Sequence, residues 1–172
     1  MADQPIVDQE TDDAKWMAKA LELADLAASH HEIPVGAIVV SQGEIIGEGY
    51  NSPISLCDPT AHAEIQAIRA ACQNTNNYRL SDATLYVTLE PCSMCAGAIV
   101  HSRIARVVYA ATEPKSGVVE SQTRFFEVDY INRSVQTKGG VMADKASAQL
   151  TKFFQYRREQ KKKLRRASKL SE

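Results

Sequence analysis

Apolar residues recur at every third or fourth position in four stretches of the chain, which is the spacing of an amphipathic helix. The first stretch carries Met17, Ala20, Leu21, Ala24 and Ala27. The pattern predicts helices at about residues 12–30, 61–73 and 93–102, and a long helix from about residue 141 toward the C-terminus.

Short apolar runs, rich in β-branched residues, separate these helices and predict strands. The run PVGAIVV is followed by the turn residues SQG and then by EIIGEGYN, which together predict a hairpin. The expected strands are 34–40, 44–51, 83–90, 105–111 and a weak strand at 134–138. Strands and helices that alternate after an opening hairpin predict an α/β fold, with a mixed five-stranded sheet covered by helices on both faces.

Length and composition predict a single domain. The chain has 172 residues, of which 44% are hydrophobic and 24% charged, as in ordinary globular proteins. We expect residues 1–10 to be disordered, residues 11–160 to form the domain and residues 161–172 to form a basic tail. No apolar run approaches the roughly 18 residues of a membrane span, and no signal peptide is visible, so we expect a cytoplasmic protein without a membrane partner.

The charges are unevenly distributed along the chain. The formal net charge is −1, but the segment 152–172 holds nine of the twenty Lys and Arg residues. Such a basic end is either a solvated tail or a surface that binds nucleic acid, and charge alone favours the solvated tail.

Two cysteines, Cys92 and Cys95, stand in the stretch EPCSMCAGAIVHS. Pro91 fits a helix entry, and the step of three residues places both thiols on one face of the helix that follows. A helix N-terminus lowers the pKa of thiols, which then bind metal or attack disulfides. Taken alone, the pair therefore fits a redox site almost as well as a metal site.

A second stretch, DPTAHAEIQAI, favours the metal. His62 and Glu64 fall at the start of the predicted helix, where both side chains can reach a point just beyond its tip. His62, Cys92 and Cys95 supply three ligands, and a catalytic zinc keeps its fourth position for water. Cys57 is an alternative fourth ligand that would make the site structural, but it leaves Glu64 without a role.

H-x-E followed by P-C-x-x-C is the signature of zinc nucleobase deaminases. The segments PVGAIVV, GEGYNSPI, DPTAHAEIQAIR, NYRLSDATLYVTLEPCSMCAGAIVHSRIARVVYA and FFQYRR carry this similarity much further, over about residues 15–160. In these segments the chain closely resembles the bacterial tRNA-specific adenosine deaminases.

The resemblance implies a three-layer α/β/α sandwich of the cytidine-deaminase type, usually a homodimer, with one zinc ion per chain. It implies conversion of adenosine to inosine at the wobble position of a tRNA anticodon, with an arginine tRNA as substrate and with Glu64 as the proton shuttle. It also implies that Asn51 and the backbone N–H of Ala63 contact the base, and that the loop 112–117 faces the RNA. In that loop Glu113 stands where the family pattern has the shorter Asp.

The end of the long helix carries further candidates for RNA contact. Arg157 and Arg158 follow the apolar stripe of this helix, together with the run Lys161–Lys163. Phe154 lies off the stripe and fits either a satellite core or a flanking base. A deaminase of free guanine or cytosine is the main alternative function, a non-catalytic RNA-binding zinc module is the second, and a thiol oxidoreductase is the third.

Overall fold

The computed structural model describes residues 9–169. It contains one five-stranded sheet with the strand order β2-β1-β3-β4-β5. The strands are β1 (Gly36–Ser41), β2 (Glu44–Tyr50), β3 (Thr84–Leu89), β4 (Arg106–Ala111) and β5 (Gln136–Lys138). The helices are α1 (Gln9–Ser29), α2 (Pro53–Leu56), α3 (Ala63–Thr75), α4 (Ser93–His101), the 3-10 turn η1 (Phe125–Glu127) and α5 (Ala143–Lys169).

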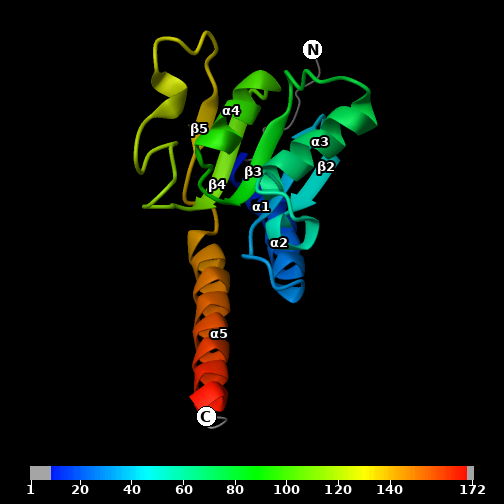
Figure 1. Cartoon of the computed structure of the whole chain (residues 1–172). Coiled ribbons are helices and arrows are strands. Elements are labelled where there is room, and N and C mark those ends of the chain that lie inside the picture. Colours follow the sequence, from blue (N-terminus) through cyan, green and yellow to red (C-terminus); the bar gives the residue numbers. More distant parts are fainter. Residues whose placement is uncertain (1–8, 170–172) are drawn as a thin grey trace, which may run out of the picture.

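Helices cover both faces of the sheet, so the predicted three-layer arrangement is confirmed (Figure 1). Alternate side chains of each strand point to opposite faces, and in β1 Val39 packs with α3 and α4 while Ile38 packs with α1. The start of α5 joins the α1 layer through the buried Ala146. In α3, Ile68 is buried and Cys72 packs against the same core.

The pairing pattern gives the sheet a common direction. β1 is antiparallel to both β2 and β3, whereas β3 pairs parallel with β4, and β4 with β5. All strands except β1 therefore run the same way, and the carboxyl ends of β2, β3 and β4 meet at one edge. Sites in α/β sheets form at such an edge.

Glycines on β2 let α3 lie directly on the sheet. A Cβ atom at Gly47 would collide with the carbonyl oxygen of Ala67, and one at Gly49 with the carbonyl oxygen of Ala63. Because both strand residues lack a side chain, the first turn of α3 is held close to the end of β2.

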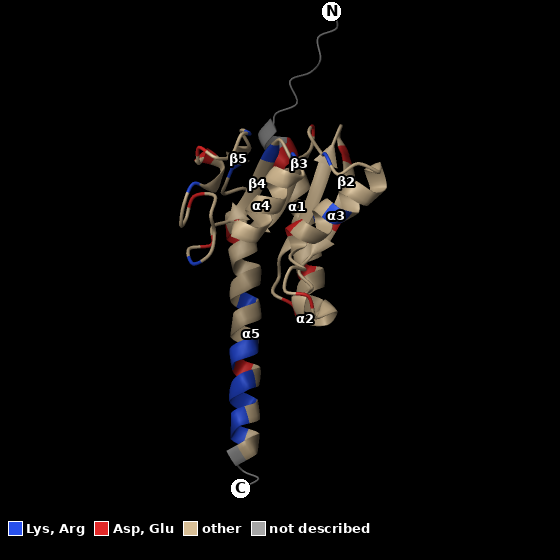
Figure 2. Cartoon of the chain, turned by 45° about the horizontal axis from the view of Figure 1, so that its top comes forward, with Lys and Arg blue, Asp and Glu red and all other residues tan. Residues whose placement is uncertain are grey.

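The ends of the chain differ in part from the expectation. α1 begins at Gln9, so residues 9 and 10 of the segment expected to be disordered are helical, and residues 1–8 lie outside the described part. At the other end α5 continues as one helix through Lys169, and Lys and Arg residues crowd its outer half (Figure 2). No helix within residues 9–169 combines the length and apolar character needed to cross a membrane.

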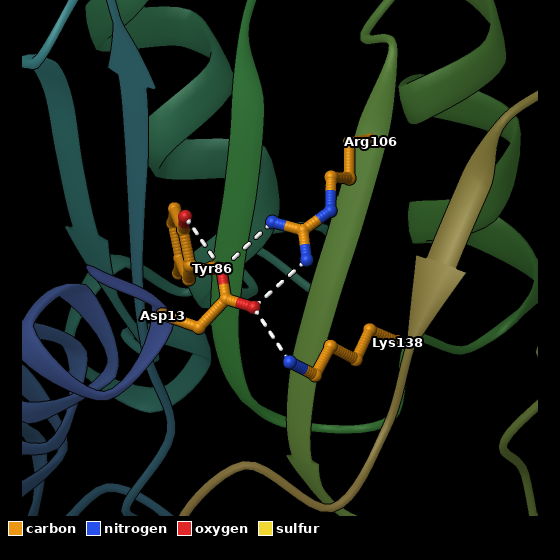
Figure 3. Close-up of polar contacts among 4 residues, drawn as sticks. All are labelled: Asp13, Tyr86, Arg106 and Lys138. Carbon is orange, nitrogen blue, oxygen red and sulfur yellow. Dashed lines mark hydrogen bonds and ion pairs between the residues drawn. The ribbon is translucent and has the colours of Figure 1, made fainter. Parts of the chain in front are cut away.

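One buried carboxylate ties α1 to three strands (Figure 3). Asp13 accepts two hydrogen bonds from Arg106, at 2.7 and 2.8 Å, and one each from Tyr86 and Lys138 at 3.0 Å. Its side chain is only 1% exposed. Burial alone would raise the pKa of Asp13. The hydrogen bonds from Arg106, Lys138 and Tyr86 outweigh this effect and lower the pKa to about 2.

Asp13→Asn should lower the free energy of unfolding by about 3 kcal/mol, because it leaves the Arg106 guanidinium poorly paired in a buried position. Urea unfolding at neutral pH measures this change. Glu22→Gln is the matched control, since the Lys19–Glu22 pair is exposed and its loss should cost less than about 1 kcal/mol.

The same network predicts a pH dependence. The pKa of Asp13 lies near 2 in the folded chain and near 3.8 when the carboxylate is free, so the carboxylate contributes roughly 2 kcal/mol above about pH 5. This stability is lost as the pH falls from about 4 through 2. Asp13→Asn should flatten the profile in that window, and parallel losses in the two proteins would contradict the assignment.

Candidate metal and catalytic site

The predicted site residues converge at the carboxyl edge of the sheet. Asn51 follows β2 directly, and His62 is the N-cap of α3. Cys92 is the N-cap of α4, and Cys95 lies buried in its first turn. Neither cap donates or accepts a capping hydrogen bond through its side chain, so the His62 ring and the Cys92 sulfur are free to turn toward each other.

Three side chains form a group with the geometry of a zinc site. Nδ1 of His62 lies 3.7 Å from Sγ of Cys92 and 3.6 Å from Sγ of Cys95. Zinc–sulfur bonds of about 2.3 Å and zinc–nitrogen bonds of about 2.0 Å at tetrahedral angles separate nitrogen and sulfur by about 3.5 Å. The two nitrogen–sulfur distances therefore suit a zinc ion, and all three ligand atoms lie within 4.8 Å of one another.

The ionisation of these groups also suits a metal. The hydrogen bond from the Cys95 thiol lowers the pKa of Cys92 to about 4, despite its burial. The same hydrogen bond and burial raise the pKa of Cys95, and the hydrogen bond with Cys92 raises the pKa of His62. At neutral pH the cluster thus already holds one thiolate, which is the form that binds zinc.

The remaining cysteines and histidines lie apart from this group. Within residues 9–169, the potential ligands gathered at this point are His62, Cys92 and Cys95. The alternative fourth ligand, Cys57, is exposed, and its thiol donates to the carbonyl oxygen of Ile54 at 3.7 Å. His101 is exposed at the end of α4.

Glu64 is buried beside the metal group, with a side chain that reaches the cavity in front of it. Burial raises the pKa of Glu64. Asn51 lies opposite, and its Oδ1 accepts a hydrogen bond of 2.9 Å from the backbone N–H of Ala63. The two expected base contacts therefore contact each other, and the Nδ2 group of Asn51 has no hydrogen-bond partner within residues 9–169.

A cavity of about 310 Å³ lies in front of the metal group. Its lining brings together most of the predicted site: Asn51, His62, Glu64, Cys92, Glu113 and Phe154. Leu150 of α5 also faces this cavity. Arg157 and Arg158 line a neighbouring groove instead, and Phe154 lines both the cavity and this groove.

Glu90 has a role that its position at the end of a predicted strand did not indicate. Its buried carboxylate accepts hydrogen bonds from the backbone N–H groups of Glu113, Val119, Glu120 and Ser121 at 2.8–3.0 Å, and from the Ser121 hydroxyl. Burial alone would raise the pKa of Glu90. These hydrogen bonds outweigh this effect, so the pKa lies below its usual value. Glu90 thus fixes the loop that brings Glu113 to the cavity.

Glu32 is a second buried carboxylate that lines the cavity, and its role was not predicted from the sequence. It accepts hydrogen bonds from the backbone N–H and the hydroxyl of Ser55, at 2.7 and 2.8 Å. These bonds hold α2 at the wall of the cavity, where α2 contributes Pro53 and Ile54. The signal available in the sequence was a lone acidic residue ahead of a strand, which is not distinctive.

Known proteins share both the sequence and the fold. A tRNA-specific adenosine deaminase of Haemophilus influenzae is 53% identical over 151 residues, which cover 87% of this chain and 87% of that protein. A structure from studies of A-to-I editing by tRNA:A34 deaminases at the wobble position of transfer RNA has a TM-score of 0.77 and 42% identity, covering 79% of this chain and 99% of that chain. A guanine deaminase of Bacillus subtilis has a TM-score of 0.56 and 36% identity, covering 66% of this chain and 83% of that chain.

Residues 10–111, more than half of the chain, match the cytidine and deoxycytidylate deaminase zinc-binding region. That segment includes His62, Glu64, Cys92 and Cys95. The chain is therefore a deaminase of the cytidine and deoxycytidylate deaminase family, in the group that holds the tRNA-specific adenosine deaminases.

Proposed function

We propose that the protein converts adenosine to inosine at the wobble position of a tRNA anticodon, with zinc as cofactor and ammonia as the second product. An arginine tRNA is the first candidate substrate. The observation that carries the proposal is the three-residue metal group with the buried Glu64 behind a cavity whose rim continues into a basic surface. The adenosine deaminases similar to this chain support the same assignment.

The residues of the site divide the work between them. His62, Cys92 and Cys95 would hold a zinc ion, which lowers the pKa of a water molecule from about 16 to near 7. Glu64 takes the proton of the attacking water and returns protons to the purine ring nitrogen and the departing amine at C6. One carboxylate can act first as base and then as acid because it lies beside both the attacking water and the purine ring.

Selection of the base falls to the opposite wall. The Nδ2 group of Asn51 is available to a base, whereas the N–H of Ala63 reaches one only by sharing or exchanging its bond to Asn51. Phe154 at the rim offers an aromatic surface to a flanking base, and Arg157 and Arg158 beyond it offer charges to phosphates. Oε1 of Glu113 accepts a hydrogen bond from the backbone N–H of Lys115 in the same loop. The other carboxylate oxygen of Glu113 is available to the RNA.

The main alternative is a deaminase of a free base such as guanine, which the similarity to the guanine deaminase favours. The cavity wall supplied by α5 argues for RNA, because Phe154 joins it to a groove lined by basic residues. A non-catalytic RNA-binding module and a thiol oxidoreductase both leave Glu64 without a role.

We also propose a homodimer in the cytoplasm. The outer face of α4 supports the dimer, because Met94, Ala98 and Val100 remain partly exposed on a helix that is apolar all round. A helix of that kind is normally buried, and a second copy would cover it.

Glu64→Ala should keep about one zinc ion per chain yet lose at least about a hundredfold in turnover, since this carboxylate moves protons and does not ligate. His62→Ala and Cys95→Ser should lose metal and activity together. Zinc analysis and inosine formation measure the two effects. Cys57→Ser is the control that keeps its zinc, and loss of metal in that variant would indicate a four-ligand structural site.

Glu90→Gln should lower turnover on RNA while zinc is retained. The amide keeps the shape of the side chain but turns one acceptor into a donor facing N–H groups, so the loop 113–121 loosens. Hydrogen exchange should rise in that loop, and inosine formation should fall about tenfold or more. Glu127→Gln, an exposed change further along the chain, is the matched control. Unchanged exchange in 113–121 would refute the anchoring role.

Adenosine in the loop of an anticodon hairpin should be deaminated, and free adenosine, cytidine, guanine and cytosine hardly at all. A free nucleoside makes none of the contacts outside the cavity that help to place the base, so it loses rate as well as affinity. Asn51→Ala should lower turnover on the hairpin and keep its zinc. Good turnover of guanine or cytosine with an inert hairpin would establish the free-base alternative.

A further inference from the structure

The cavity in front of the metal group contains a hydrogen-bond acceptor that the proposed mechanism does not use. Both bonds that Ser55 donates to Glu32 end on the same oxygen, Oε1. The other oxygen, Oε2, accepts no hydrogen bond within residues 9–169. Among the described side chains, the one buried polar atom without a partner is Oε1 of Gln149, so Oε2 of Glu32 is not sealed inside the protein. It opens into the cavity that Glu32 lines.

The protein holds this oxygen in a fixed direction. The backbone N–H of Glu32 donates to the carbonyl oxygen of Ala27 at 3.0 Å, which ties Glu32 to the last turns of α1. The two bonds from Ser55 hold the other end of the side chain. Glu32 is only 2% exposed, so its carboxylate has little room to turn. Oε2 is therefore a preorganised acceptor, and a ligand that donates to it does not first have to order the side chain.

The surroundings of Oε2 determine which kind of group can bind there. Its neighbours on this wall are the apolar residues Ile33, Val35, Pro53 and Ile54. Of the described residues that line the cavity, none is a Lys or Arg. A carboxylate without a cation beside it repels phosphate groups, so its partner must be a neutral group that carries a donor. A ligand that covers Oε2 without donating removes its water and leaves it unpaired, which weakens binding.

An adenosine within an RNA chain has one such donor for this wall. Its ring nitrogens N1, N3 and N7 are acceptors. The exocyclic amine must face the metal group and Glu64, because it is the group that leaves. The 3′ oxygen is esterified, so the 2′-hydroxyl is the remaining donor of the target nucleotide. That hydroxyl is what distinguishes RNA from DNA at a given site.

We infer that Glu32 is a specificity-determining residue, which accepts a hydrogen bond from the 2′-hydroxyl of the target adenosine and makes the cavity select ribose over deoxyribose. This inference rests on the proposed function and adds recognition of the sugar to recognition of the base. The backbone N–H of Asn51 donates to the carbonyl oxygen of Val35 at 3.0 Å, so the segment that carries Asn51 adjoins the segment that carries Glu32. The base contact and the sugar contact thus come from neighbouring segments, as base and ribose adjoin in one nucleoside.

Hairpins that differ only in the 2′ substituent of the target adenosine test the inference. The substituents are hydroxyl, hydrogen and fluorine, because fluorine keeps the sugar pucker of ribose but cannot donate a hydrogen bond. With the unaltered protein, kcat/KM should fall by about tenfold to a hundredfold for both hydrogen and fluorine, which is the range for a hydrogen bond to a charged group. Fluorine should be no better than hydrogen, since it would face a carboxylate oxygen.

Substitutions separate recognition of the sugar from support of α2. Glu32→Ala should lose most of the preference for ribose. Glu32→Gln keeps an oxygen for Ser55 and presents an amide to the cavity, which can donate to fluorine or hydroxyl, so fluorine should now be preferred over hydrogen. Ser55→Ala weakens the support of α2 but leaves Oε2 in place, and it should keep the preference of the unaltered protein. Glu113→Gln removes an equal charge from the same cavity and should keep it too.

The outcomes distinguish a direct contact from a structural role and from failure of the proposed function. A preference for ribose that keeps its full size in Glu32→Ala would overturn the inference. So would a preference that falls as far in Ser55→Ala or Glu113→Gln as in Glu32→Ala, or one that ranks fluorine and hydrogen alike in Glu32→Gln. If the unaltered protein deaminates ribose and deoxyribose targets equally well, Glu32 does not read the sugar and the proposed function stands. If no hairpin is deaminated, the proposed function fails first.

Discussion

A metal site shared by two helices exists only if both helices start within a few ångströms of each other. Here His62 and Cys92 lie 30 positions apart in sequence, yet their ligand atoms are 3.7 Å apart. The common direction of β2 and β3 brings both helix starts to one edge of the sheet, and the glycines of β2 let α3 approach closely enough. The cavity, its acid–base residue and its loops are all arranged around this meeting point.

Around the metal group, the carboxylates of Glu90 and Glu32 accept hydrogen bonds from backbone N–H groups and serine hydroxyls, and not from cations. Glu90 fixes the loop after β4, and Glu32 fixes α2, so each carboxylate holds one wall of the cavity. A buried carboxylate that accepts several N–H bonds is well stabilised, and it requires no opposing charge. The walls are thereby rigid without basic side chains inside the cavity, which leaves positive charge to the outer rim.

Much of this arrangement follows from the sequence, for identifiable reasons. The strand and helix patterns predicted the sheet and its two layers of helices, and the motif spacing predicted that His62, Cys92 and Cys95 lie together, because apolar periodicity and motif spacing are local signals. The roles of Glu90 and Glu32 were not predicted, because their partners are backbone N–H groups and serine hydroxyls, which give no distinctive sequence signal. Leu150 has the spacing of a core residue, but the helix leaves the sheet there and the side chain faces the cavity. The basic run from residue 161 was predicted to be a tail because like charges repel, whereas α5 continues through it as a helix.

The network around Asp13 has a consequence for the order in which the protein assembles on the ribosome. Its partners Arg106 and Lys138 lie 93 and 125 positions further along the chain. At about 5 to 20 residues per second, Lys138 is synthesised roughly 6 to 25 seconds after Asp13. During that interval the Asp13 network lacks Lys138, so the contact that ties the start of α1 to β5 is among the last to form.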